Sequence, residues 1–198
     1  MKLEARGYTV LCPQQPSTDA NPPTKTMYDD ADLVRSELEL LVENGKDILL
    51  VMHSYGGVVG TQAAAGLGKA ERQKKGQKGG ELAPFIKPEE DGSCNPMNPE
   101  QVFYQDLSPE EQKHWASRLR PQGTITQFNP LTQVAYEDIP LSYLYCENDQ
   151  ALPLAIQKLM VEKCGVKVQE FTCSAGHSPF LSQPDMFVDC VIKASETI

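Results

Sequence analysis

Residues 49–57 read Leu-Leu-Val-Met-His-Ser-Tyr-Gly-Gly, and this stretch decides the fold class. The continuous apolar run within 47–52 is typical of a central parallel strand that is covered on both faces. Small and apolar residues over 58–67 predict a helix that packs tightly against that strand. The sequence therefore predicts a strand that turns abruptly at Ser54 into a helix, as in an α/β unit.

Strand and helix signals alternate on both sides of this turn. A β-prone run predicts a strand over 7–12, and apolar residues at helical spacing predict a helix over 27–43. Towards the carboxyl end we expect strands over 140–146 and 166–171 and helices over 108–120, 152–164 and 183–194. The expected fold class is α/β, a doubly wound and mostly parallel sheet.

The length and the irregular middle of the chain set the expected domain organisation. A chain of 198 residues with 40% hydrophobic residues suits one domain, 1–198, with a sizeable core. Residues 81–135 are rich in proline and irregular, so we expect an inserted lid over 93–136. The basic, glycine-containing segment 69–80 predicts a solvated helix end and loop, with an anion-binding patch as the alternative.

The composition argues against several classes of partner. A formal net charge of −9 does not supply the basic face that nucleic acid requires. No run approaches the roughly 18 apolar residues of a membrane span, and the first residues lack the apolar core of a signal peptide. We therefore expect a cytoplasmic protein with no nucleic-acid or membrane partner, and the sequence leaves a homodimer open.

The cysteines and histidines do not form a pattern that binds metal. Six cysteines are scattered without a compact spacing, so we expect reduced thiols rather than disulfides. The three histidines are not spaced with the cysteines as zinc ligands would be. The sequence therefore predicts no metal site.

Ser54 is the first candidate for chemistry. A serine in a sharp turn between strand and helix takes a positive φ, and its neighbours must be small where the two backbones converge. Gly56 and Gly57 meet that need, whereas Met52 stands where the strict Gly-x-Ser-x-Gly pattern has its first glycine. Such a turn favours a nucleophile, although a serine–glycine turn can also cradle a phosphate.

Two later loops supply a candidate acid and a candidate base. Asp149 follows the expected strand 140–146, and His177 lies in the sequence Ala-Gly-His-Ser after the next one. Alone, Asp149 could be a turn or N-cap residue and His177 a solvated or structural residue. Glu147 is a rival acid that lies nearer the strand body. Together with Ser54 these residues stand at carboxyl ends of strands, where such sheets have their sites, which favours a catalytic triad.

The roles in this triad follow from ordinary acyl-transfer chemistry. His177 removes the Ser54 hydroxyl proton, Asp149 fixes the imidazole tautomer, and Tyr55 gives its backbone N–H to the oxyanion hole. Three further side chains are candidates for binding the substrate: His53, Trp115 and Phe180. For each of the three, packing against the protein core is the alternative.

Three segments carry a resemblance to a known family: His-Ser-Tyr-Gly-Gly (53–57), Cys-Glu-Asn-Asp-Gln-Ala-Leu-Pro (146–153) and Ala-Gly-His-Ser-Pro-Phe (175–180). Together they resemble the α/β-hydrolase superfamily, in the branch that includes plant methylesterases, hydroxynitrile lyases and similar fungal proteins. The resemblance spans nearly the whole chain. It implies small esters, lactones or related carbonyl compounds as substrates, no cofactor and a mostly helical lid. The family's triad carries over onto Ser54, Asp149 and His177.

This chain differs from the family's pattern in two places. Members usually begin with a strand and a loop that supplies a second oxyanion N–H, whereas this chain starts near the helix that follows that loop. Members also usually have a hydrophobic strand after the elbow helix, where this chain runs from Lys78-Gly79-Gly80 directly to Glu81. We therefore expect a shortened fold that lacks N-terminal strands and one strand after the elbow.

The sequence leaves three functions open. The favoured one is a serine hydrolase that acts on a small, fairly apolar ester or lactone. The second is a lyase, decarboxylase or cyclase that uses Ser54 and His177 for proton transfer without an acyl-enzyme. The third is a non-catalytic ligand-binding protein or a shortened gene product without activity.

Overall fold

The structure is a computed structural model that describes residues 2–68 and 82–196. The basic segment 69–80, for which we predicted a solvated loop or an anion-binding patch, lies outside the described residues. The chain divides into two compact units. The β4–β5 unit comprises Met1–Cys12, Pro96–Leu119 and Pro140–Ile198, and the α1–α2 unit comprises Pro13–Asn95 and Arg120–Ile139.

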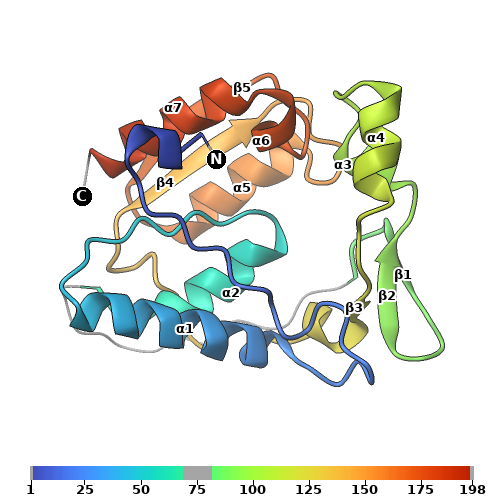
Figure 1. Cartoon of the computed structure of the whole chain (residues 1–198), viewed down its shortest axis with the longest axis horizontal. Helices are drawn as coiled ribbons and strands as arrows, with labels where there is room; N and C mark the ends of the chain where they lie inside the picture. Colours follow the sequence, from blue (N-terminus) through green and yellow to red (C-terminus); the bar gives the residue numbers. More distant parts are fainter. Residues whose placement is uncertain (1, 69–81, 197–198) are drawn as a thin grey trace. The chain divides into compact units, whose positions relative to one another are not determined.

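The β4–β5 unit is built on two parallel strands, β4 (Leu141–Cys146) and β5 (Val168–Cys173). Helix α5 (Leu154–Cys164) makes the crossover that a parallel pair requires. In the view of Figure 1, α5 lies below the strands and α7 (Pro184–Ser195) above them. This is the layered α/β arrangement predicted for the carboxyl half, with strand and helix bounds within about two residues of the expected ones.

The carboxyl ends of the two strands lie side by side, because Cys146 pairs in register with Cys173. The loops that follow are tied to each other by backbone hydrogen bonds. Glu147 N–H donates to the Cys173 carbonyl at 2.9 Å, and Asn148 N–H donates to the Ala175 carbonyl at 3.1 Å. The loop after β4 and the loop after β5 therefore form one framework.

The side chain of Gln157 on α5 supports the end of β4. Its Oε1 accepts from the Cys146 N–H at 3.0 Å, and its Nε2 donates to the Cys146 carbonyl at 2.9 Å and to the Leu152 carbonyl at 2.7 Å. Gln157 is almost completely buried. Its amide satisfies the backbone groups on the side of β4 that faces away from β5, as a neighbouring strand would.

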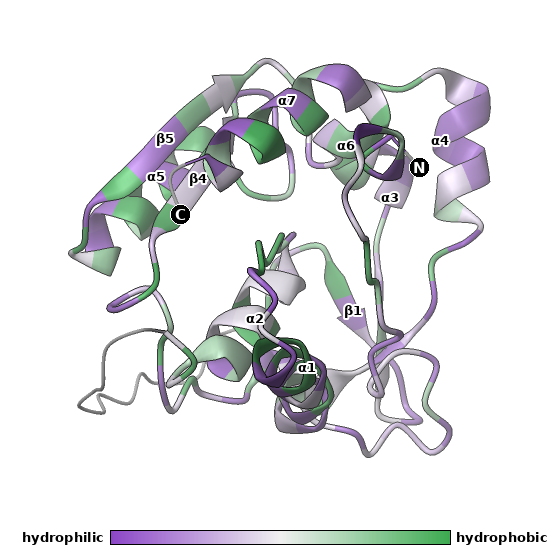
Figure 2. Ribbon diagram, turned by 60° about the vertical axis from the view of Figure 1, so that its left-hand side comes forward, coloured by the Kyte–Doolittle hydropathy of each residue, from purple (hydrophilic) through white to green (hydrophobic). Residues whose placement is uncertain are grey.

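Short helices complete the β4–β5 unit: η1 (Glu4–Arg6), α3 (Pro99–Phe103), α4 (Pro109–Ala116) and α6 (Pro179–Ser182). Helix α4 has Ser108 as its N-cap, which forms a capping box with Glu111, and the helix ends at Ala116 rather than at 120. Figure 2 shows α4 as mostly hydrophilic. None of the helices in the described ranges is long and apolar enough to cross a membrane.

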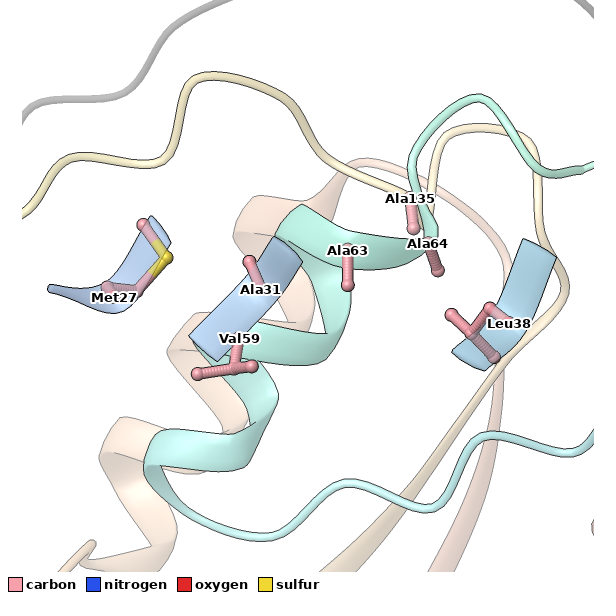
Figure 3. Packing of buried hydrophobic residues seen from close by; sticks show 7 residues of the cluster. All are labelled: Met27, Ala31, Leu38, Val59, Ala63, Ala64 and Ala135. Atoms are coloured by element: carbon pink, nitrogen blue, oxygen red, sulfur yellow. The ribbon is translucent and has the colours of Figure 1, made fainter. Parts of the chain in front are cut away.

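The α1–α2 unit is built on helices α1 (Met27–Glu43) and α2 (Tyr55–Ala64), which pack against each other. The prediction of a helix over 27–43 is confirmed at both ends. The buried residues between the helices are mostly alanine, which lets the two backbones approach closely. Figure 3 shows this cluster, which consists of Met27, Ala31, Leu38, Val59, Ala63, Ala64 and Ala135.

The same unit contains a small sheet that the sequence did not predict. Its strands are β1 (Ile86–Pro88), β2 (Ser93–Pro96) and β3 (Gln122–Gly123), in the order β1-β2-β3, with β2 and β3 antiparallel. The 3-10 helix η2 (Thr124–Gln127) follows β3. The segment 93–136, expected as a lid, thus contributes residues to both units, since residues 96–119 belong to the β4–β5 unit.

Two predicted strands are wrong. Residues 7–12 and 47–52 have no strand conformation, and Val51 and Met52 are 49% and 37% exposed. A strand exists only where its backbone pairs with a neighbour, and no segment among residues 2–68 and 82–196 pairs with either stretch. The apolar pattern predicted strands correctly only where β4 and β5 supply each other's partner.

Candidate active site

Ser54, directly before α2, has the positive φ that the sequence predicted for it. Ser54 has a φ of 50° and a ψ of −126°, which lies outside the left-handed helical region and is unfavourable for a residue with a side chain. Gly56 N–H donates to the His53 carbonyl and Gly57 N–H to the Ser54 carbonyl, both at 2.8 Å. This conformation leaves Ser54 exposed at the beginning of α2.

Gly60, rather than Gly56 or Gly57, is the glycine that close packing requires. A Cβ on Gly60 would collide with the Met52 Sδ and would lie 2.9 Å from the Met52 Cγ. A Cβ on Gly56 or Gly57 would meet nothing within 4 Å. The prediction that the glycine pair must be small is therefore wrong, because α2 approaches residues 50–52 one turn later.

A buried hydrogen-bond network fixes the first residue of α2. The Tyr55 hydroxyl donates to Asp30 Oδ2 at 2.7 Å, and Ser17 donates from its N–H to Oδ1 at 2.8 Å and from its hydroxyl to Oδ2 at 2.6 Å. Asp30 is completely buried. Burial, and then the hydrogen bond to Asp30, raise the pKa of Tyr55, so the phenol stays a neutral donor.

This network also orients a backbone N–H group. Tyr55 is the first residue of α2, and the N–H groups of a first helical turn have no partner within the helix. Its N–H is therefore available to an anionic oxygen near Ser54. Acidic residues such as Asp30 are common at the start of a helix, so the contact of Asp30 with Tyr55 could not be read from the sequence.

His177 and Asp149 form a buried pair at the carboxyl ends of β5 and β4. The His177 Nδ1 lies 2.9 Å from Asp149 Oδ2 and 3.1 Å from Oδ1, and both residues are 8% exposed. A carboxylate oxygen accepts hydrogen bonds, so this contact requires a proton on His177 Nδ1. Of the two candidate acids, Asp149 is the one that binds His177.

Asp149 is held in place by its own turn. Its Oδ1 accepts from the N–H groups of Ala151 and Leu152, both at 2.8 Å. The turn role that we considered as the alternative is thus present together with the hydrogen bond to His177. One carboxylate oxygen is fixed by the backbone, which leaves the other directed at the imidazole.

Phe103 is a contact of His177 that the sequence did not reveal. Its ring stacks on the imidazole with centroids 5.1 Å apart and an interplanar angle of 28°. Phe103 ends helix α3, far from His177 in the sequence. No local pattern marks it, because only the tertiary fold brings the two rings together.

The three predicted substrate-binding side chains lie in different environments. His53 is exposed and directly precedes Ser54. Trp115, on α4, is half-buried and meets the His114 ring edge-on, with centroids 5.1 Å apart. Phe180, on α6, packs edge-on against Phe187 of α7 at 5.9 Å. Contact with α7 agrees with the packing alternative for Phe180.

The predicted triad residues belong to two units. Ser54 and Tyr55 are in the α1–α2 unit, and Asp149 and His177 are in the β4–β5 unit. Each unit holds its part in a defined geometry: one holds a serine directly before the first turn of α2, and the other holds an imidazole hydrogen-bonded to a carboxylate. Within the described ranges no group of three or more His, Cys, Asp or Glu residues could hold a metal ion, and no disulfide is formed.

Comparison with known proteins identifies the family. A model of the alpha/beta hydrolase family matches residues 1–190, so the chain belongs to the alpha/beta hydrolase family. The chain is 27% identical to Alpha/beta hydrolase nvfD of Aspergillus novofumigatus (strain IBT 16806), over 98% of this chain and 88% of that protein.

Solved structures show the same fold. A pyrethroid hydrolase from Sphingobium faniae JZ-2 superposes with a TM-score of 0.73 at 20% identity, covering 98% of this chain and 89% of that chain. The methylesterase MES16 from Arabidopsis gives a TM-score of 0.63 at 19% identity, covering 100% and 91%. The predicted resemblance and the α/β-hydrolase fold are therefore confirmed, with a small sheet that is consistent with a shortened fold.

Proposed function

We propose that this protein is a serine hydrolase of small, fairly apolar esters or lactones, with Ser54 as nucleophile, His177 as base and Asp149 as acid. The observation that carries the proposal is the buried hydrogen bond of 2.9 Å between His177 Nδ1 and Asp149 Oδ2. The φ of 50° at Ser54 supports it, since strain of this kind accumulates at functional sites. Membership of the alpha/beta hydrolase family supports the reaction class.

The proposed reaction has two half-reactions. The Ser54 oxygen bonds to the ester carbonyl carbon while His177 Nε2 takes the hydroxyl proton, and the carbonyl oxygen becomes an oxyanion that accepts the Tyr55 N–H. The bond to the alkoxide then breaks, and His177 gives its proton to the leaving oxygen. Water attacks the acyl-enzyme by the same route and releases the acid, which restores Ser54.

Asp149 has two functions in this mechanism. It keeps the proton on Nδ1, so that Nε2 is the unprotonated nitrogen. It also stabilises the imidazolium that forms when Nε2 takes up the serine proton. Its own fixation by two backbone N–H groups keeps this orientation without any rearrangement during the reaction.

The names of similar proteins support the substrate class. One is a pyrethroid hydrolase, another a methylesterase, and a third a polyneuridine aldehyde esterase. Ester and lactone carbonyls share the chemistry that the triad needs, since both present a carbonyl carbon with an oxygen leaving group. We propose His53, Trp115 and Phe180 as side chains that bind the substrate.

Hydrolysis of p-nitrophenyl esters of increasing chain length tests the proposal. Ser54→Ala and His177→Ala should each lower kcat by about 10⁴-fold or more, and Asp149→Asn by a comparable factor because the wrong tautomer is then favoured. Ser36→Ala, which changes an exposed serine on α1, should leave kcat unchanged. Hydrolysis that persists in Ser54→Ala would contradict the proposal, and folded protein without any hydrolysis would favour a proton-transfer enzyme or a ligand-binding protein.

A further inference from the structure

The segment between α3 and α4 touches the loop that carries His177. Asp106 Oδ2 accepts the N–H of Gly176 at 2.6 Å, a contact between residues 70 positions apart. A hydrogen bond this short to a carboxylate is of the strong, charge-assisted kind. Because Gly176 directly precedes His177, the bond fixes the backbone from which the imidazole projects.

Gly176 provides the space for this contact. Its φ is not in the left-handed region, so the backbone conformation does not require glycine. A Cβ at this position would collide with the Gln105 Nε2 and would lie 2.9 Å from Asp106 Oδ1. The glycine before the histidine is therefore explained by the close approach of residues 105–106.

The neighbouring Gln105 reaches the loop that carries Asp149. Its Nε2 donates to the Asn148 carbonyl at 2.7 Å, and the Asn148 side chain donates to the Ser174 carbonyl at 2.6 Å. From α4, Gln112 donates to the Leu107 carbonyl at 2.9 Å and so braces the turn after Asp106. Two adjacent side chains thus hold the residue before the acid and the residue before the base.

Phe103 contacts one face of the His177 imidazole. Its ring is stacked on His177, whose Nδ1 is held by Asp149 at the same time. A ring with one nitrogen bound and one face covered cannot rotate about its Cβ–Cγ bond without losing both contacts. The stack also shields the His177–Asp149 hydrogen bond from water, which strengthens it.

We infer that Phe103, Gln105 and Asp106 are positioning residues for the reaction: they set the direction in which His177 Nε2 points. The inference rests on the proposed function, because this direction matters for rate only if His177 is the base. A base displaced by a fraction of an ångström transfers its proton less well, and the loss appears in kcat. The segment predicted as part of a lid is then a support for the catalytic pair.

Activity of Asp106 variants gives the first half of the test. Asp106→Ala removes the acceptor for Gly176 and should lower kcat for p-nitrophenyl butyrate by about tenfold to a hundredfold, with KM changed less than about twofold. Asp106→Asn keeps a side-chain acceptor and should restore kcat to within about threefold of the unmodified protein. Glu110→Ala, an exposed carboxylate on α4, is the matched control and should have no effect.

Nitrogen-15 NMR of the histidines gives the second half and does not depend on hydrolysis. The chain has only three histidines, so a spectrum of His177→Ala assigns the His177 signals. In the unmodified protein His177 should be in the Nδ1–H tautomer with a slowly exchanging proton. Phe103→Leu and Asp106→Ala should each give a mixture of tautomers and a faster exchange of that proton, whereas Glu110→Ala should not.

The two readouts separate the possible failures. If the unmodified protein does not hydrolyse esters but the tautomer changes occur, the proposed function fails and the positioning of the imidazole stands. If kcat, tautomer and exchange are all unchanged in Asp106→Ala and Phe103→Leu, the inference is overturned. If Asp106→Ala does not fold, Phe103→Leu and Asp106→Asn decide by the same spectra. An equal loss of kcat in Glu110→Ala would also overturn it.

Discussion

Alanine substitutions in α2 test which glycine the packing requires. The structure requires Gly60, whereas the sequence motif pointed to Gly56 and Gly57. At Gly60, alanine gains about 1 kcal/mol of helix propensity but must displace Met52, and overpacking of this kind costs about 1–3 kcal/mol. The Met52 Cγ at 2.9 Å is close to the backbone, so rotation of the side-chain end alone does not relieve the collision. We expect Gly60→Ala to destabilise the protein by about 1 kcal/mol.

Gly57→Ala is the matched variant, since it lies in the same helix and its Cβ would meet nothing within 4 Å. It should stabilise the protein by about 0.5–1 kcal/mol through helix propensity alone. The two variants should therefore differ by about 2 kcal/mol, which is about 4–8 °C in Tm for a chain of this size. Urea and thermal unfolding followed by circular dichroism measure the difference. Destabilised Gly57→Ala with unaffected Gly60→Ala would refute the packing described for this turn.

Three further predictions concern other contacts. Tyr55→Phe removes one donor from a buried carboxylate and should destabilise the protein by about 1–3 kcal/mol in urea unfolding, whereas Tyr28→Phe, which loses a more exposed bond, should cost less; equal losses would contradict the network. The hydrogen bond from the Thr26 N–H, and then the contact with Lys25, lower the pKa of Asp29 to about 2. The ionised Asp29 should therefore contribute its full capping energy of about 1 kcal/mol at neutral pH, and this contribution should disappear as the pH falls from about 4 through 2. The difference in unfolding free energy between the protein and Asp29→Asn, measured at each pH, should shrink over that interval; a constant difference would exclude the capping role. Burial raises the pKa of Cys146, so iodoacetamide should modify exposed Cys12 first and Cys146 only after unfolding, as mass spectrometry of peptides would show; early modification of Cys146 would contradict its burial.

The sequence correctly predicted the elements that are stabilised by contacts within themselves or by pairing with each other. Helix α1 has a capping box at Thr26 and an apolar stripe, so its bounds could be read directly. Strands β4 and β5 were correct because the crossover helix between them brings them into register. Residues 47–52 have an equally apolar pattern but no pairing neighbour among the described residues, and a pattern cannot reveal the absence of a partner.

The candidate site was only partly visible in the sequence. The motifs marked Ser54, Asp149 and His177 as candidates because each comes shortly after a β-prone or apolar run in the sequence. Phe103 and Asp106 were missed, because their contacts with residues 176–177 depend on the tertiary fold. The only related sequence feature is the glycine before His177, and the structure explains it by the close approach of residues 105–106 rather than by a positive φ.

The chemical state of Ser54 tests the triad most directly. Intact-mass analysis and peptide mapping after treatment with a fluorophosphonate should find one adduct, on Ser54, that forms at least about a hundredfold more slowly in His177→Ala. An adduct on a different serine, or equal labelling of Ser54 with and without the imidazole, would contradict the assignment of nucleophile and base.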